Sequence, residues 1–244
     1  MPSKVRLNKF LASTGLASRR GSENLIREGR VKIDGVVVRE LGVQVDPARS
    51  IIEVDDERVQ QTPSMWIALN KLPRTICTRT DPQGRPTVYE SLHADHRQLF
   101  HVGRLDVMSE GLLLFTNDGD VAQAMLHPSR RVPRRYEVTT RGLLPPRLAD
   151  TLESGVKLED GRARAERVRI RKGPRQGQHV IELVLREGRN REVRRLMRAL
   201  DVHVDALKRV GFGPIELGRL KPGTWRRLGA GELRSLRRLT KNKR

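Results

Sequence analysis

The chain has 244 residues, a length that suggests one or two domains. Its 49 Lys and Arg residues and 29 Asp and Glu residues give a net charge of +20. No apolar stretch approaches the ~20 residues of a membrane span, the first residues lack the apolar core of a signal peptide, and a single cysteine, Cys77, excludes a disulfide framework. We therefore expect a cytoplasmic protein, without membrane contact, whose partner is a polyanion such as nucleic acid.

The positive charge is concentrated in the last third of the chain. Residues 161–244 carry 25 basic and 8 acidic side chains, whereas residues 61–160 carry 13 and 12 and residues 1–60 carry 11 and 9. A solvated charged surface needs no excess of one sign. The imbalance therefore favours a nucleic-acid partner over the alternative, an Arg-rich surface that serves solubility alone.

Residues 1–60 are predicted to form a small module of two short helices and a β segment. The apolar spacing from Leu7 to Leu16 predicts the first helix. Ser18 is a suitable cap for the second helix, which ends at Gly29, and Asp34-Gly35 predicts a hairpin turn. The cations that this module can lay along a phosphate backbone are Lys9, Arg19, Arg20, Arg27 and Arg30.

This module has a recognisable sequence pattern. The stretch RLNKFLASTGLASRRGSENLIREGRVKIDG resembles the αL RNA-binding motif of a small-subunit ribosomal protein and of bacterial tyrosyl-tRNA synthetases. The resemblance implies that the two helices lie on structured RNA. The alternative is a generic helical module with a charged outer face.

A polar linker at 61–64 is predicted to separate this module from a second domain at 65–240, followed by a basic tail at 241–244. The patterns predict strands at 65–70, 74–78, 99–102, 111–115, 134–140, 164–171, 179–186 and 204–210, and helices at 119–126, 145–154, 190–200 and 230–238. Strands outnumber helices and often follow one another directly. We therefore expect an α+β fold with a mostly antiparallel, mixed sheet and helices packed on it.

Several kinds of catalytic site are excluded by their missing motifs. The chain has neither the GxxxxGK[ST] loop of P-loop nucleotide sites nor the GxSxG turn of serine hydrolases. His93, His96 and His101 lie close in sequence, but they lack a carboxylate at metal-binding spacing. We interpret them as solvated loop residues and expect no metal.

Asp106 is the strongest candidate for a catalytic residue. It lies in the segment HVGRLDVMSEGLLLFTNDG, just before the apolar run GLLLF, and Gly103 and Gly111 let the backbone turn on either side. A carboxylate at the rim of a buried strand is partly desolvated, which suits a nucleophile or a base, and it needs a cation to stay ionised. The alternative is that Asp106 pairs with Arg104 and merely closes a turn.

Tyr136 is a second candidate, on a predicted strand among cations in the segment PRRYEV. A ring beside an arginine can hold a nucleobase by stacking. The alternative is a strand tyrosine packed against the core.

The segment EGRNREVRRLM predicts a helix that carries a third candidate. Val193 and its neighbours at helical spacing form a core-facing stripe, and Asn190 is placed to cap the helix. Arg194 lies at the edge of this stripe and Arg195 points away, so Arg194 is expected to be the one partly buried guanidinium here. A buried charge needs a partner, for which Asp106 is the candidate.

Three segments in this order, HVGRLDVMSEGLLLFTNDGD, LHPSRRVPRRYEV and EGRNREVRRLM, strongly resemble the RsuA/RluB family of pseudouridine synthases. The likeness includes LNKLPRTICTRTDPQGRPTV, and its DPQGRPTV part is similar to the RluB branch, whose substrate is large-subunit ribosomal RNA. The resemblance implies a cleft across the sheet, with Asp106 as the catalytic aspartate, Tyr136 stacked on the target base and Arg194 as the partner of the aspartate. The chain departs mildly from the family pattern at Ser109, Arg134 and Glu192, where Thr, Lys and Gln are common.

The reaction implied is an isomerisation of uridine that needs no cofactor. Asp106 would attack C1′ or remove the 2′-proton, and the residues alone leave that choice open. The target base must leave its stack, and phosphate contacts offset that cost. We expect a monomer that acts on a large-subunit hairpin or an assembling subunit. The alternatives are small-subunit or other RNA, or a catalytically silent ribosome-assembly protein. The cations expected to hold RNA in this domain are Arg104, Arg134, Arg189 and Arg191.

Overall fold

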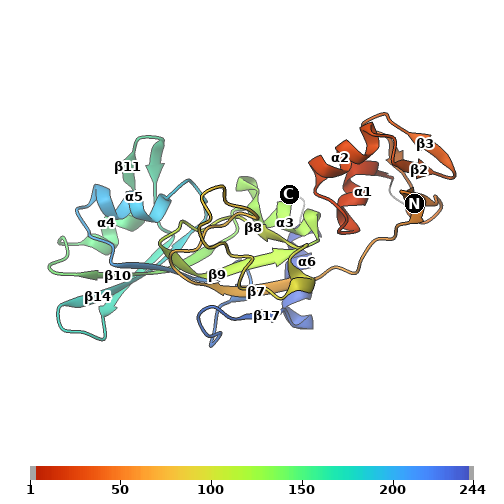
Figure 1. Cartoon of the computed structure of the whole chain (residues 1–244). Helices are drawn as coiled ribbons and strands as arrows, with labels where there is room; N and C mark the ends of the chain where they lie inside the picture. The colour runs from red at the N-terminus through yellow and green to blue at the C-terminus, as the bar shows by residue number, and fades with distance from the viewer. Residues whose placement is uncertain (1–3, 242–244) are drawn as a thin grey trace. The chain divides into compact units, whose positions relative to one another are not determined.

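The structure is a computed structural model that describes residues 4–241. The chain divides into two compact units (Figure 1). One contains the N-terminal residues up to Met65 together with 98–100 and 117–119, and the other contains 66–97, 101–116 and 120 onward. Most of the predicted basic tail, 242–244, lies outside the described residues. Among the described residues, no helix combines the length and the apolar character needed to cross a membrane.

The N-terminal unit contains the two predicted helices, α1 (Leu7–Ser13) and α2 (Arg19–Arg27). Ser18 caps α2 as predicted, because its side chain accepts a hydrogen bond from the Gly21 N–H. The hairpin turns at Asp34-Gly35, where both residues have positive φ. The strands of the N-terminal unit are β1 (Val5–Arg6), β2 (Val31–Ile33), β3 (Val36–Val38), β4 (Gln44–Val45), β5 (Ile52–Val54) and β6 (Glu57–Arg58). The helices cover the β segment through a buried cluster that includes Leu7, Phe10, Leu11, Ile26, Val31, Val45 and Ile52.

The second unit is built on a mixed sheet that has nine strands within the described part of the chain. The strand order is β13-β14-β10-β15-β9-β7-β17, with β16 on β15 and β8 on β9. Strands β9 and β15 run parallel, and the other registered pairs are antiparallel, which confirms the predicted α+β class. The strands are β7 (Trp66–Lys71), β8 (Phe100–Val102), β9 (Ser109–Thr116), β10 (Arg134–Arg141), β13 (Arg167–Lys172), β14 (Gln178–Leu185), β15 (Ala206–Phe212), β16 (Ile215–Glu216) and β17 (Trp225–Arg227).

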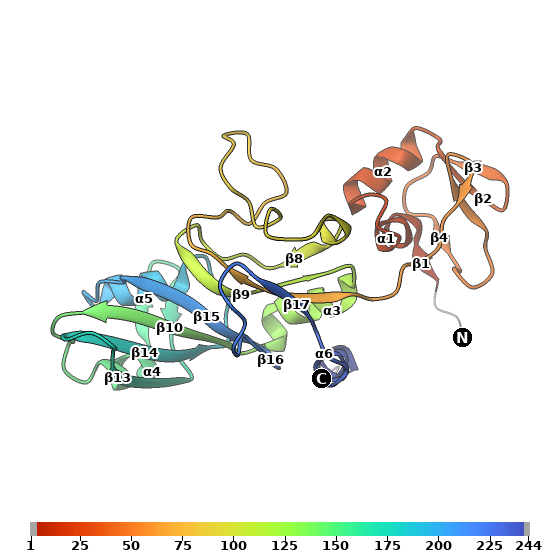
Figure 2. The ribbon, with the colours of Figure 1, turned by 60° about the horizontal axis from the view of Figure 1, so that its bottom comes forward.

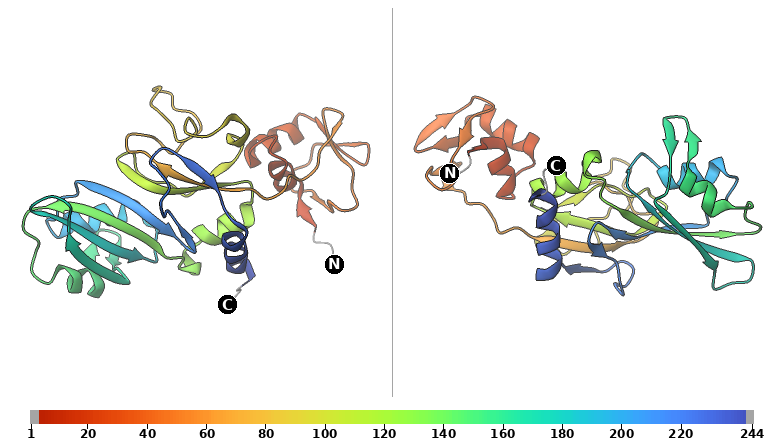
Figure 3. Two further views of the ribbon diagram at one scale, coloured as in Figure 1. Left: turned by 90° about the horizontal axis from the view of Figure 1, so that it is seen from below. Right: turned by 180° about the vertical axis from the view of Figure 1, so that it is seen from behind.

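Helices pack on the sheet in two groups, around two separate apolar clusters. Helices α3 (Gly119–Leu126) and α6 (Ala230–Lys241, dark blue in Figure 3) meet β7 and β9. Helices α4 (Leu148–Ser154) and α5 (Glu192–Ala199) meet β10, β14 and β15. A small hairpin, β11 (Val156–Leu158) and β12 (Gly161–Ala163), precedes β13, and short 3-10 turns occur at Ala94–His96 and Pro128–Arg130.

The segment between β7 and β8 covers one side of the sheet with loops (Figure 2). The strand predicted at 74–78 is wrong: it makes only one isolated bridge, Ile76 to Thr87. The backbone turns away at Arg74, which has a φ of 64°, directly after a proline that cannot donate to a ladder. The ring of Tyr89, from this segment, meets Phe115 of β9 edge-on at 5.4 Å.

The prediction that the histidines are solvated loop residues is wrong for two of them. His101 is half-buried on strand β8. The His96 side chain is buried, and its ring meets Trp225 edge-on with centroids 4.7 Å apart. The ring packs against an aromatic residue from a strand that is distant in the sequence. The spacing of residues near His96 gives no sign of this contact.

Candidate active site

Asp106 lies in the turn between β8 and β9, and the backbone around it is held by specific contacts. The Ser109 N–H donates to the Asp106 carbonyl oxygen at 3.0 Å. One residue earlier, Leu105 donates its N–H to Cys77 Sγ at 3.4 Å, and the Cys77 thiol lies within hydrogen-bond reach of the Leu105 carbonyl. These contacts hold the backbone of the loop that precedes the apolar strand β9, where the sequence pattern predicts Asp106 to lie. The Asp106 side chain keeps 28% of its surface exposed.

Lys71, the last residue of β7, holds the same turn through hydrogen bonds to its backbone. Its side chain is fully buried, and Nζ donates to the carbonyl oxygens of Ser109 at 2.7 Å, Leu72 at 2.9 Å and Val107 at 3.2 Å. Burial lowers the pKa of this ammonium group, and the charge of Asp106 acts in the opposite direction. Sequence reasoning missed Lys71, although a lysine at the end of a strand that is apolar from Trp66 to Leu69 is a usable signal.

Two guanidinium groups from the start of α5 face the Asp106 carboxylate. Arg194 Nε and Arg191 Nη1 each lie 3.7 Å from the same oxygen, Oδ2. The Arg194 side chain is 17% exposed and that of Arg191 is 55% exposed. The predicted contact between Arg194 and Asp106 is therefore confirmed, and within the described residues no ion pair joins Asp106 to Arg104.

Arg194 is held in place by one of its terminal nitrogens. Its Nη2 donates to the Met108 carbonyl oxygen at 3.2 Å and to Ser109 Oγ at 3.4 Å, so it grips the turn that carries the carboxylate. Burial lowers the pKa of this guanidinium, and the charge of Asp106 opposes that change. Arg194 thus places a positive charge beside Asp106 where water screens it poorly.

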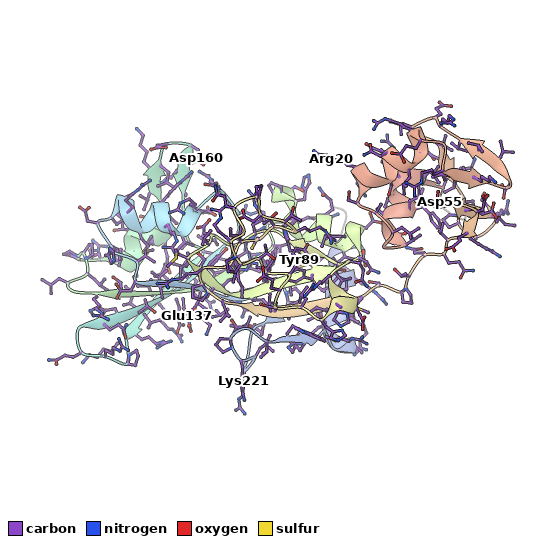
Figure 4. The ribbon with its side chains drawn as sticks, in the orientation of Figure 1. Arg20, Asp55, Tyr89, Glu137, Asp160 and Lys221 are labelled. Atoms are coloured by element: carbon purple, nitrogen blue, oxygen red, sulfur yellow. The ribbon has the colours of Figure 1, made fainter. Side chains whose placement is uncertain are left out.

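Two details of the α5 prediction are wrong. The residue before the helix is Arg191, in a left-handed conformation with a φ of 49°, and no side chain caps the helix, so Asn190 is not the cap. Arg194 is also not the one shielded guanidinium, because Arg195 is only 20% exposed and Arg189 only 23%. Arg195 points away from Asp106 as predicted, but Asp160, in the turn of the β11–β12 hairpin (Figure 4), pairs with it.

Two cavities have Asp106 in their walls. The smaller one, of about 130 Å³, brings Asp106 and Tyr136 together. The larger one, of about 720 Å³, is an open groove shared by Asp106, Arg191 and Arg194. A flat ring can enter the first cavity while a polynucleotide strand occupies the second, since one is narrow and the other broad and cationic.

Comparisons with known proteins agree with this geometry. The family model described as RNA pseudouridylate synthase matches residues 65–199, and the S4 domain model matches residues 5–51. The chain belongs to the RsuA/RluB family of RNA pseudouridine synthases. It is therefore an isomerase with an N-terminal S4 RNA-binding domain.

Individual relatives span nearly the whole chain. An "Uncharacterized RNA pseudouridine synthase" of Aquifex aeolicus is 42% identical over 96% of this chain and 94% of its own length. A "Ribosomal large subunit pseudouridine synthase B" of Bacillus subtilis is 36% identical over 96% of both chains, and one of Vibrio vulnificus is 39% identical over 96% of this chain and 75% of its own. A solved structure entitled "Crystal structure of pseudouridylate synthase" is 27% identical, with a TM-score of 0.66, over 95% of this chain and 99% of its own.

The cations predicted to hold RNA in the synthase domain take different positions. Arg104 and Arg191 line both cavities. Arg134 is buried: it donates to the carbonyl oxygen of Glu187 at 2.9 Å and stacks on the Phe212 ring, so it forms cavity wall. Arg189 pairs with the Glu187 carboxylate at 2.6 Å and donates to carbonyl oxygens of the β11–β12 hairpin, so it ties that hairpin to the start of α5.

The cations of the S4 domain also differ in exposure and in whether a carboxylate already pairs with them. Arg19, Arg20 and Arg27 are exposed on α2 (Arg20 is labelled in Figure 4), and Lys9 is half-buried on α1. Arg30 is already neutralised, because its guanidinium holds both oxygens of Asp55, at 2.8 and 2.6 Å, and also pairs with Glu28.

Two further residues line the smaller cavity but were not predicted to do so from the sequence. Glu192, noted there only as a departure from the family pattern, is buried at the start of α5 and accepts the Arg189 N–H at 3.3 Å; burial raises the pKa of its carboxyl group. Arg209 of β15 is also buried in the cavity wall. The alternation in ALKRVGF places Arg209 on the same face as Leu207, and that clue could have indicated an inward-facing arginine.

Proposed function

We propose that this enzyme converts a specific uridine of large-subunit ribosomal RNA to pseudouridine, with Asp106 as its catalytic carboxylate. The observation that carries the proposal is that Asp106 lines two cavities. Its Oδ2 lies 3.7 Å from Nε of the half-buried Arg194, and Tyr136 lines the smaller cavity with it. The isomerisation requires a carboxylate that acts on the sugar, a shielded cation beside that carboxylate, and a ring that stacks on the flat base.

The reaction exchanges one bond at the sugar for another. The bond between N1 of uracil and C1′ breaks, with its electron pair going to the base. The base then turns and C5 bonds to C1′, after which C5 loses its proton and N1 gains one. Atoms and electrons balance without an oxidant or a leaving group, since the base is retained.

Asp106 has two routes open to it. It can attack C1′ and hold the sugar as an ester until C5 attacks, or it can remove the 2′-proton as the base leaves, with the electron pair of that bond forming a C1′–C2′ double bond, and return the proton to C2′ when C5 bonds to C1′. Both routes use the carboxylate as an anion, and Arg194 supplies the opposite charge 3.7 Å away. One carboxylate suffices, whereas a glycosidase needs a second one to protonate a departing group.

Tyr136 is the residue we assign to stacking on the uracil. It is half-buried on β10 and lines the cavity that Asp106 borders. A base enters that cavity only after leaving its own stack, a step that costs a few kcal/mol and that phosphate contacts in the groove can offset. Arg104 and Arg191 supply such contacts, since both line the groove beside Asp106.

The choice of large-subunit RNA rests on the relatives and on charge. The Bacillus subtilis and Vibrio vulnificus proteins carry the name of a large-subunit enzyme. The S4 domain and the net charge of +20 suit a large structured RNA. The alternatives are a small-subunit or other RNA target, and a silent protein that only binds RNA.

Pseudouridine mapping tests the proposal. Ribosomal and transfer RNA from a strain that lacks the gene are compared with RNA from the parent and from the deletion strain that expresses the wild-type chain again. We expect one large-subunit uridine to lose its modification and to regain it on re-expression. Loss of a small-subunit or transfer-RNA site instead, or no loss at all, would overturn the large-subunit assignment.

A further inference from the structure

Arg209 occupies a position in the cavity wall that the reaction above leaves unexplained. The strand register places it directly opposite Tyr136 on β10 and opposite Gly111 on β9. Paired residues on adjacent strands project from the same face of a sheet, with Cβ atoms about 5 Å apart. Arg209 therefore lies beside the tyrosine assigned to the base, and only 3% of its surface is exposed.

The backbone leaves Arg209 little freedom to move. A Cβ on Gly111 would lie 2.3 Å from the Arg209 carbonyl oxygen, so a glycine with a φ of 98° is needed for β9 to approach β15 this closely. The Arg209 Nε donates to the Leu112 carbonyl oxygen at 2.8 Å, and its guanidinium carbon lies 4.8 Å from the centroid of the Phe212 ring. One nitrogen and one face of the guanidinium are therefore already bound.

Of the two terminal nitrogens of Arg209, Nη2 is the unusual one. Arg209 Nη2 is buried and has no hydrogen-bond partner among the described residues. An unpaired buried donor is costly, and a ligand or a bound water that accepts from it removes that cost. The other guanidinium on the Phe212 ring, Arg134, instead has its Nη1 donating to the Glu187 and Val132 carbonyl oxygens.

We propose that Arg209 Nη2 donates a hydrogen bond to a ring carbonyl oxygen of the target uracil, and so holds the base while its bond to the sugar is exchanged. The inference rests on the proposed function, which places the base beside Asp106 and Tyr136. Uracil carries two carbonyl acceptors, O2 and O4, on either side of N3. A guanidinium always donates, so it matches either oxygen.

The symmetry of uracil makes one fixed donor sufficient for both halves of the reaction. A half-turn about the line through N3 and C6 exchanges N1 with C5 and, with them, O2 with O4. A donor that holds one carbonyl before the base turns therefore meets the other carbonyl afterwards. Arg209 takes no part in the bond changes; it binds the base in both orientations, which keeps the detached base from leaving.

Thio-substituted RNA tests this contact, because sulfur is a poorer acceptor than oxygen. The substrate is a transcript that contains the uridine modified by the wild-type enzyme, with uridine, 2-thiouridine or 4-thiouridine at that position. Single-turnover rates are measured for the wild type, Arg209→Met and Arg209→Lys. Arg226→Met is the control, since Arg226 is a partly exposed strand arginine paired with Glu232 outside the cavity.

The wild type is expected to act about tenfold or more slowly on at least one thio substrate. Arg209→Met is expected to act on uridine roughly 10- to 100-fold more slowly than wild type, and to lose most of that discrimination. Arg226→Met should keep both the wild-type rate and the discrimination. A variant with only a structural defect would lower all three rates by the same factor.

Three results would overturn the inference. They are equal wild-type rates on all three substrates, an unchanged thio effect in Arg209→Met, and an unchanged thio effect in Arg209→Lys if the methionine variant fails to fold. Failure of the wild type to convert any uridine would instead refute the proposed function, so the two failures are distinguishable.

Discussion

The two arginines that face Asp106 provide a matched pair for testing the electrostatic part of the mechanism. Both lie 3.7 Å from Oδ2, but Arg194 is 17% exposed and Arg191 is 55% exposed. At that distance and an effective dielectric constant near 20, two unit charges attract by about 4 kcal/mol, whereas an exposed pair contributes about 0–1 kcal/mol. Arg194→Met should therefore lower the rate of the chemical step by roughly 100- to 1000-fold, and Arg191→Met by about fivefold at most.

The assay is single-turnover release of tritium from C5 of the target uridine, at RNA concentrations that saturate each variant. Saturation separates the chemical step from RNA binding, to which Arg191 can contribute. Equal defects in the two variants, or a nearly normal rate for Arg194→Met, would refute the reasoning that burial decides which cation supports Asp106.

Three further outcomes are expected. Lys71→Met should lower the unfolding free energy by roughly 3 kcal/mol, because it leaves the carbonyl groups that hold the Asp106 turn without a donor; an unchanged melting temperature would contradict this. The contribution of Glu192 to the stability of the wild type should fall as pH rises from 4.5 through its raised pKa, because there its folded-state carboxyl group binds more protons than the unfolded one. Glu192→Gln should remove that fall and be the more stable protein near pH 7 in urea unfolding, by about 1.4 kcal/mol for each tenfold change in the acid constant. Arg20→Gln should reduce the salt dependence of RNA binding by about 0.7–0.9 in log–log slope if it contacts one phosphate, whereas Arg30→Gln, already paired with Asp55, should change it little.

Local patterns predicted those parts of the fold that local physics determines. The caps and turns of the S4 domain follow from Ser18 and Asp34-Gly35, whose effects reach only a few residues. The position of Arg194 beside Asp106 followed from helical spacing together with the need of a buried charge for a partner. These inferences required no knowledge of how the strands are ordered.

The features that sequence reasoning missed depend on contacts between distant segments. His96 is buried because Trp225 meets its ring, and Lys71 is buried because the Asp106 turn offers it carbonyl oxygens. Arg209 becomes a cavity residue only once β15 pairs with β10 and β9. Strand order and register bring these groups together, and neither can be read from periodicity along one strand.

The central claim is that Asp106 carries out the isomerisation, and Asp106→Asn tests it most directly. The amide keeps the size of the side chain but can neither attack C1′ nor accept the 2′-proton. Asp150→Asn is the control, since Asp150 is an exposed acid on α4 paired with Arg147. We predict that Asp106→Asn binds the substrate RNA within about threefold of wild type and forms no pseudouridine, while Asp150→Asn retains both properties. Pseudouridine formation by Asp106→Asn at a rate comparable to wild type would contradict the account.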